Sequence, residues 1–108
     1  MGFRTLADRR PRVFISQPMR GHSEEEILAV REQALEAAKG ILGVPEVIEI
    51  PSYIPSFEDD NPVSSLGKSI DMMADADLVI FCEGWGAVRR CRIEYAVATE
   101  YDLNIREF

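Results

Sequence analysis

Apolar residues form two short uninterrupted runs along the chain, and a stretch with helical spacing follows each of them. Residues 12–17 read Arg-Val-Phe-Ile-Ser-Gln and stop at Pro18, which predicts a strand that a proline ends. Residues 77–82 begin with an aspartate and continue through apolar side chains, a pattern typical of a parallel strand that is buried on both faces. The two runs therefore predict two strands of one sheet.

The segments around these strands predict three helices and two shorter strands. Ser23 is followed by three glutamates, the pattern of a capping serine with an acidic first turn, and apolar residues then recur at helical spacing. The helices are expected at residues 24 to 40 or 43, at residues 64 or 65 to 76 with Ser64 or Ser65 as the cap, and at residues 87–101. The short strands are expected at residues 47–50 and 103–105, and residues 51–62, with three prolines, predict a long loop.

The resulting order β-α-β-α-β-α-β predicts an α/β fold with three layers. Helices long enough to cross over connect parallel strands, and the right-handed crossover rule places them on the faces of the sheet. We expect about four parallel strands in the order 2-1-3-4. One domain is expected over residues 12–108, after a flexible basic tail over residues 1–11.

Composition and charge narrow the class of protein. An apolar fraction of 46% in 108 residues is typical of one small globular domain, and no apolar run is long enough for a membrane span. Residues 1–12 carry four arginines and one aspartate, a charge of +3, so residues 13–108 must carry −10 to give the total of −7. Such an acidic body disfavours nucleic-acid binding. The N-terminus lacks the apolar core of a secretory signal, so we expect a cytoplasmic protein.

The cysteine and histidine inventory gives no metal-binding pattern. Cys82 and Cys91 lack the spacing of a zinc site, and His22 is the one histidine of the chain. We expect reduced core cysteines, no metal ion and no other cofactor.

The predicted strand order also locates a ligand crevice. The chain reverses direction beside the first strand, so the crevice opens at the carboxyl ends of the first and third strands. The candidate ligand-binding residues at these ends are Ser16, Gln17, Met19, Arg20, Gly21, Trp85 and Arg89. Arg20 is either a solvated loop charge or a clamp for an anionic group, and Trp85 is either a stacking wall for a planar ligand or a cap on the core.

Glu94 interrupts the apolar stripe that Cys91, Ala98 and Tyr101 form on the third predicted helix. An unpaired buried carboxylate is costly, so Glu94 is expected to face a partner or a cavity. One interpretation is an ion pair with Arg90, four residues earlier on the helix surface, or a partly buried structural salt bridge. The pattern alone slightly favours this interpretation, because ion pairs are common on helices. The other interpretation is a catalytic or ligand-binding carboxylate.

Four short motifs carry a family resemblance: residues 13–21 (VFISQPMRG), 76–81 (ADLVIF), 84–85 (GW) and 89–94 (RRCRIE) before an alanine-rich helix. In this order they resemble a family of small bacterial and phage proteins of largely undefined function. That family is grouped with the nucleoside 2-deoxyribosyltransferases and nucleotide N-glycosidases. The likeness covers about residues 12–106.

The resemblance implies a flavodoxin-like (Rossmann-like) fold, usually oligomeric, in which a helix glutamate attacks the anomeric carbon of a 2-deoxyribosyl group. Glu94 matches this nucleophile. The sequence departs from the group at three positions. Ser69 stands where an aspartate is frequent, Val88 where members that bind a 5′-phosphate often have a serine, and Arg90 where a glycine is common.

Two functions are therefore expected as alternatives. The first is an N-glycosidase or 2-deoxyribosyltransferase-like enzyme that acts on a nucleoside or nucleotide through Glu94. The second is a non-catalytic module that binds a nucleotide or nucleotide-derived signal in the same crevice, since the fold alone does not separate the two. In either case the expected partners are a small molecule and further copies of the chain, at least in a dimer.

Overall fold

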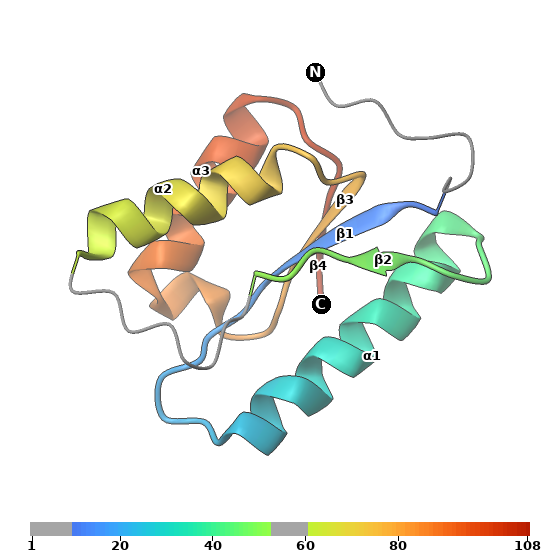
Figure 1. Cartoon of the computed structure of the whole chain (residues 1–108), viewed down its shortest axis with the longest axis horizontal. Coiled ribbons are helices and arrows are strands. Elements are labelled where there is room, and N and C mark those ends of the chain that lie inside the picture. Colours follow the sequence, from blue (N-terminus) through green and yellow to red (C-terminus); the bar gives the residue numbers. More distant parts are fainter. Residues whose placement is uncertain (1–9, 53–60) are drawn as a thin grey trace.

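The computed structural model describes residues 10–52 and 61–108. Most of the predicted tail, residues 1–9, and part of the predicted long loop, residues 53–60, lie outside the described residues. The elements follow one another in the predicted order (Figure 1). They are β1 (Arg12–Ser16), α1 (Glu24–Leu42), β2 (Ile48–Glu49), α2 (Pro62–Met73), β3 (Leu78–Phe81), the short 3-10 helix η1 (Trp85–Ala87), α3 (Arg89–Glu100) and β4 (Ile105–Glu107).

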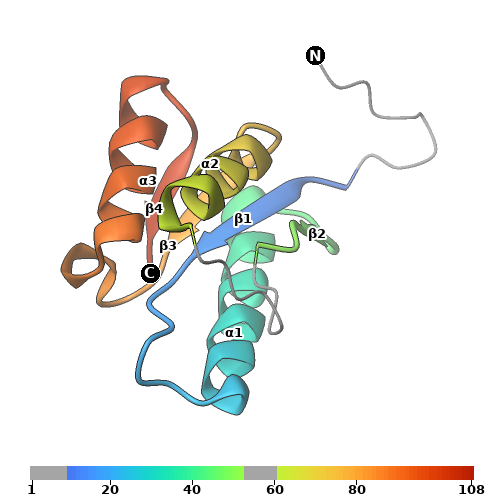
Figure 2. The ribbon, with the colours of Figure 1, turned by 60° about the vertical axis from the view of Figure 1, so that its left-hand side comes forward.

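All strand pairs are parallel, and the strands lie in the order β2-β1-β3-β4. The longest pairing joins β1 to β3, from Val13 opposite Leu78 to Ser16 opposite Phe81. Helix α1 covers one face of the sheet, and α2 and α3 cover the other (Figures 1 and 2). The predicted three-layer, flavodoxin-like α/β fold with order 2-1-3-4 is confirmed.

Two apolar layers form because β1 and β3 are buried on both faces. Successive side chains of a strand point to opposite faces. Val13 and Ile15 therefore pack toward Ala34 and Ala38 of α1. On the opposite face the core holds Phe14, Val79 and Phe81 with Met73 of α2 and Ala98 of α3. The alternation along β1 decides which polar side chain at its end faces which helix layer.

Helix α1 begins and ends at the residues that its sequence signals predict. Ser23 and Glu26 form a capping box: the Glu26 carboxylate accepts the backbone N–H of Ser23 at 2.7 Å, and the Ser23 hydroxyl accepts the backbone N–H of Glu26 at 3.1 Å. The backbone N–H of Ser23 at the carboxylate, and next the Ser23 side chain, lower the pKa of Glu26. At the other end Gly43 adopts φ 66°, a left-handed conformation that glycine tolerates at a helix end.

Helix α2 differs from the prediction at both ends. Its cap is Asn61, whose side chain accepts the backbone N–H groups of Val63 and Ser64, and Pro62 is its first residue. The prediction that Ser64 or Ser65 caps this helix is wrong, because an asparagine followed by proline is the stronger start signal. The helix ends at Met73 rather than near residue 76.

The bounds of the last helix and strand also shift. Residues 85–87 form the 3-10 helix instead of the first turn of α3, which begins at Arg89. Tyr101 follows the last helical residue and is 76% exposed, so its predicted place on the buried stripe is wrong. Asp102 takes a positive φ of 56° in the turn after it. Strand β4 starts two residues later than predicted, at Ile105.

Candidate functional site

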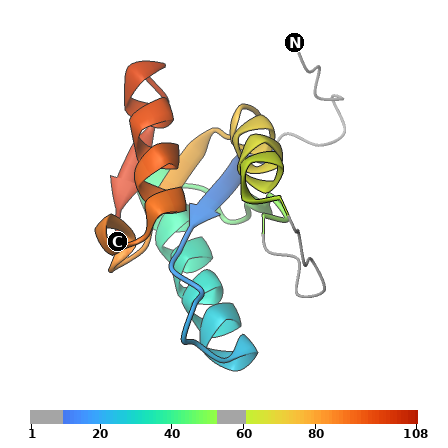
Figure 3. The same cartoon turned by 90° about the vertical axis from the view of Figure 1, so that its left-hand side faces the viewer.

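The candidate site lies where β1 and β3 end and the loops into α1 and α3 begin, the edge that Figure 3 faces. Ser16 is the last residue of β1, and Phe81 is the last residue of β3. Glu94 lies in the second turn of α3 and is completely buried. The carboxylate predicted to face a partner or a cavity is therefore placed beside the end of the central strand.

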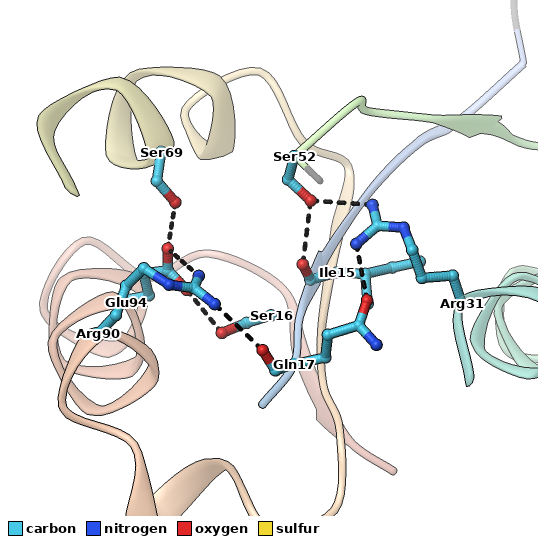
Figure 4. Close-up of polar contacts among 8 residues, drawn as sticks. All are labelled: Ile15, Ser16, Gln17, Arg31, Ser52, Ser69, Arg90 and Glu94. Carbon is cyan, nitrogen blue, oxygen red and sulfur yellow. Dashed lines mark hydrogen bonds and ion pairs between the residues drawn. The ribbon is translucent and has the colours of Figure 1, made fainter. Parts of the chain in front are cut away.

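The carboxylate of Glu94 receives two hydrogen bonds on each oxygen (Figure 4). The Ser16 hydroxyl donates to Oε1 at 2.6 Å, and the Ser69 hydroxyl of α2 donates to Oε2. Arg90 Nη1 lies 3.1 Å from Oε1 and 3.0 Å from Oε2. Of the two forms of ion pair expected for Glu94, the structure has the partly buried one with Arg90, because two hydroxyls from other elements enclose the same carboxylate.

Arg90 also ties α3 to the end of β1. Its Nη2 donates to the backbone carbonyl of Gln17 at 3.1 Å. About 30% of the Arg90 side chain is exposed, whereas Glu94 is not exposed at all. Arg90 therefore lies between the buried carboxylate and solvent.

The side chain of Gln17 points to the opposite layer. Gln17 is two residues after Ile15, so it faces α1, where its Nε2 donates to the carbonyl of Ile27 at 3.2 Å. Its Oε1 accepts a hydrogen bond of 2.8 Å from Arg31 Nη1. The backbone and side chain of Gln17 thus contact two arginines on opposite faces of the sheet.

Arg31 is a buried charged residue that the sequence interpretation missed. It is 3% exposed, and its guanidinium contacts the carboxylate of Glu49. The guanidinium also donates to the hydroxyl of Ser52 at 2.9 Å (Figure 4). The Ser52 hydroxyl donates in turn to the carbonyl of Ile15 at 3.1 Å. This network holds the end of β2 against β1. A signal was present, because Arg31 lies on the buried stripe of α1 as Glu94 does on that of α3.

Four other predicted ligand-binding residues lie in the loop after β1 and at the start of α3. Met19, Arg20 and Gly21 belong to the loop after β1, where Met19 is partly buried and the next two residues are exposed. Gly21 has φ 86°, a backbone conformation that favours glycine. Arg89 is exposed at the start of α3. The structure thus brings Ser16 and the Gln17 backbone to the Glu94–Arg90 pair. The loop residues after β1 and Arg89 lie nearer to solvent.

Trp85 makes its contacts within the protein. Its ring stacks on Tyr95 with centroids 4.2 Å apart and an interplanar angle of 15°, and it packs at 5.6 Å from Phe81. Its Nε1 donates to the carboxylate of Glu107 at 3.1 Å. One face of the indole is therefore occupied, so a planar ligand would meet the other face or the ring edge.

A cavity of about 380 Å³ opens at the carboxyl ends of β1 and β3 on the α1 side of the sheet. Its walls combine apolar side chains with polar ones, among them two glutamates and the one histidine. They are Gln17, Pro18, His22, Glu26, Ile27, Val30, Gln33, Cys82, Glu83 and Phe108. Gln17 belongs both to this cavity and to the group around Glu94, so the two lie on either side of the same strand end.

Both cysteines are free and buried, as expected from the sequence. Burial raises the pKa of the Cys82 thiol to about 11, and burial also raises the pKa of Cys91. At neutral pH both thiols are therefore protonated and weakly nucleophilic.

Alkaline pH is expected to destabilise the fold through Cys82. The pKa of Cys82 is raised from 9.0 in the unfolded chain to about 11 in the fold, so its stabilising effect is complete below pH 9 and is lost as the pH rises toward 11. Urea unfolding at a series of pH values should show a falling midpoint over this window. Cys82→Ala should flatten this part of the curve, and an unchanged slope in that variant would contradict the assignment.

Within residues 10–52 and 61–108 no group of three His, Cys, Asp or Glu side chains is placed to hold a metal ion. None of the helices in the same residues is long and apolar enough to cross a membrane.

In comparisons with known proteins, no family model matches the chain, and neither the curated proteins nor the solved structures give a significant match.

Proposed function

We propose that the protein is an N-glycosidase, or a 2-deoxyribosyltransferase-like enzyme, that acts on a nucleoside or nucleotide with Glu94 as its nucleophile. The observation that carries this proposal is a completely buried carboxylate that is oriented by hydroxyls from two other elements at the carboxyl end of β1. Parallel α/β sheets bind their ligands at this edge. A helix glutamate at this position is also what the family resemblance implies.

The chemistry requires a carboxylate beside the sugar. An Oε atom of Glu94 bonds to C1′ while the C1′–N bond breaks, and the base leaves with that electron pair and takes up a proton from water. The transition state is oxocarbenium-like, so the negative carboxylate stabilises it. Water then attacks C1′, loses a proton to solvent and releases the sugar, which restores the carboxylate. In the transfer reaction a second base replaces this water.

Ser16 and Ser69 are positioning residues in this proposal. Each hydroxyl donates to a different oxygen of Glu94, which fixes the plane of the carboxylate relative to β1 and α2. Ser69 stands where the resembling enzymes often have an aspartate, and here its hydroxyl contacts Glu94. In the resembling enzymes that aspartate helps to hold the base. The role proposed for Ser69 is instead orientation of the nucleophile.

The test is release of free base. The protein is incubated with the common deoxynucleosides and with their 5′-monophosphates, and the products are separated by chromatography. Base release by the wild type and its loss in Glu94→Gln would support the proposal. The absence of base release from every compound would reject it.

One observation favours the second candidate function, a binding module without catalysis. Both oxygens of Glu94 already hold two hydrogen bonds, as the oxygens of a purely structural ion pair do. In that case calorimetry would detect binding of a nucleotide, and chromatography would find no base released.

We further propose a cytoplasmic homo-oligomer, at least a dimer. Several large apolar side chains on the helices are exposed, namely Leu28 and Ile41 of α1, Val63 of α2 and Ile93 of α3. Covering such side chains with a second copy removes apolar surface from water. Light scattering at micromolar concentration should give at least twice the chain mass of 12.2 kDa. A monomer mass would contradict this proposal.

A further inference from the structure

The carboxylate of Glu94 has no free acceptor position in the described structure. A carboxylate offers about two lone-pair directions on each oxygen. Ser16 and Arg90 contact Oε1, and Ser69 and Arg90 contact Oε2. Attack on a carbon atom requires one of these lone pairs, so a nucleophilic Glu94 must first lose a donor.

Arg90 is the donor that can leave. Ser16 is completely buried at the end of β1, and Ser69 is 7% exposed on α2, so neither hydroxyl has an alternative partner in solvent. About 30% of the Arg90 side chain is exposed, and the residue lies in the first turn of α3. A rotation of one long side chain would therefore open the carboxylate without moving a strand or helix.

A ligand that draws Arg90 away must carry an anionic group. A guanidinium forms paired hydrogen bonds with phosphate as readily as with carboxylate, and a phosphate monoester carries more negative charge than one carboxylate. The start of α3 favours an anion in the same place, because Val88 gives it no side-chain cap and Arg89 is exposed beside it.

Withdrawal of Arg90 would leave Glu94 buried without a cation, which is costly. In the proposed reaction the positive charge that develops at C1′ takes the place of the guanidinium. The resting ion pair would thus be exchanged for two new pairs, one between Arg90 and the ligand anion and one between Glu94 and the sugar.

We propose that Arg90 is a specificity-determining latch: a phosphate group on the substrate draws its guanidinium from Glu94 and so frees the nucleophile. This inference rests on the proposed N-glycosidase function. It makes deoxynucleoside 5′-monophosphates, rather than free deoxynucleosides, the substrate class. Arg90 then recognises the phosphate in place of the serine that Val88 replaces.

Binding measurements test the recognition of phosphate without requiring turnover. Calorimetry compares the common deoxynucleosides with their 5′-monophosphates on the wild type, on Arg90→Gln and on the matched control Arg92→Gln, whose wild-type side chain contacts the Gly86 carbonyl instead. The wild type and the control should bind a monophosphate at least about 10-fold more tightly, as expected for a charge-assisted arginine contact. Arg90→Gln should lose this preference. A wild type without the preference, or a folded Arg90→Gln that keeps it, would overturn the proposal.

Labelling of carboxylates tests the latch itself. A water-soluble carbodiimide with an amine couples to accessible carboxylates, and mass spectrometry locates the products. Without ligand, Glu94 should be unlabelled in the wild type and in Arg92→Gln, and labelled in Arg90→Gln. A folded Arg90→Gln whose Glu94 stays unlabelled would overturn the proposal.

If Arg90→Gln does not fold, Arg90→Lys replaces it, because it keeps the charge but cannot span both Glu94 and the Gln17 carbonyl. Arg90→Lys should show a reduced preference for monophosphates and partial labelling of Glu94. Wild-type values for both measurements would overturn the proposal.

The two proposals fail differently. Binding of monophosphates through Arg90 without release of any base would reject the N-glycosidase function and support anion recognition by Arg90. Base release at equal rates from nucleosides and monophosphates would support the function and overturn the latch.

Discussion

Glu94→Gln is expected to lower the rate of base release by on the order of 10³-fold or more, as is usual when a nucleophile is removed. The amide has nearly the shape of the carboxylate, but it carries no charge to stabilise the oxocarbenium-like transition state and is a poor nucleophile. The measurement is the initial rate of base release by chromatography. The matched control is Glu100→Gln, which removes an exposed carboxylate of the same helix and should leave the rate unchanged.

The hydrogen bonds of Glu94 determine how this experiment must be run. A glutamine at this position has one acceptor oxygen where Ser16, Ser69 and Arg90 all donate to the carboxylate, so the variant should also lose stability, by about 1–3 kcal/mol. A lower melting temperature by itself therefore does not distinguish a catalytic from a structural role. Rates must be compared at a temperature at which circular dichroism shows the variant to be folded. Undiminished turnover in folded Glu94→Gln would reject Glu94 as the nucleophile.

The fold was predictable because burial on both faces leaves a strong pattern. Residues 13–15 and 78–82 are apolar without interruption, and crossover helices between parallel strands leave few topologies. The exact bounds were less predictable, because they depend on local capping. Asn61 with Pro62 starts α2 earlier than the serines suggest, and the turn at residues 84–88 delays the start of α3.

The site was predictable only in part, since a sequence pattern shows which position is unusual but not what meets it. Glu94 was identified because a charge on an apolar stripe needs a partner, and the same rule applied to α1 would have identified Arg31. The contact between Ser69 and Glu94 joins positions 25 residues apart and depends on how α2 packs against α3. The stacking of Trp85 on Tyr95 depends likewise on the turn after β3. Such long-range contacts leave no periodic signal.

Arg31→Met is expected to lower the free energy of unfolding by about 3 kcal/mol, a large part of what a small domain has. The methionine keeps the apolar stem within the layer of α1 but removes the guanidinium. The amide oxygen of Gln17, which is 1% exposed, then loses the donor that the structure provides. Strand β2 also loses its link to α1, because Arg31 contacts Glu49 at the end of this two-residue strand and Ser52 just after it. Urea unfolding followed by circular dichroism measures the change.

Glu49→Gln is the matched control, because it removes the ion pair but leaves the rest of the Arg31 network in place. The Glu49 side chain is 37% exposed, whereas the Arg31 side chain is 4% exposed, so the variant leaves a buried guanidinium without its carboxylate. A glutamine oxygen can still accept the hydrogen bond from Arg31 Nε, so the loss should be smaller than in Arg31→Met. If the ion pair with Glu49 were the main contribution of Arg31, both variants would lose about the same amount. A much larger loss in Arg31→Met would instead assign the stability to the buried contacts with Gln17 and Ser52.

Because Arg90 holds the backbone carbonyl of Gln17, which Arg31 contacts through its side chain, Arg31→Met should also weaken nucleotide binding in protein that is still folded. Unchanged binding in folded Arg31→Met would show that Gln17 does not need Arg31 to keep the end of β1 in place.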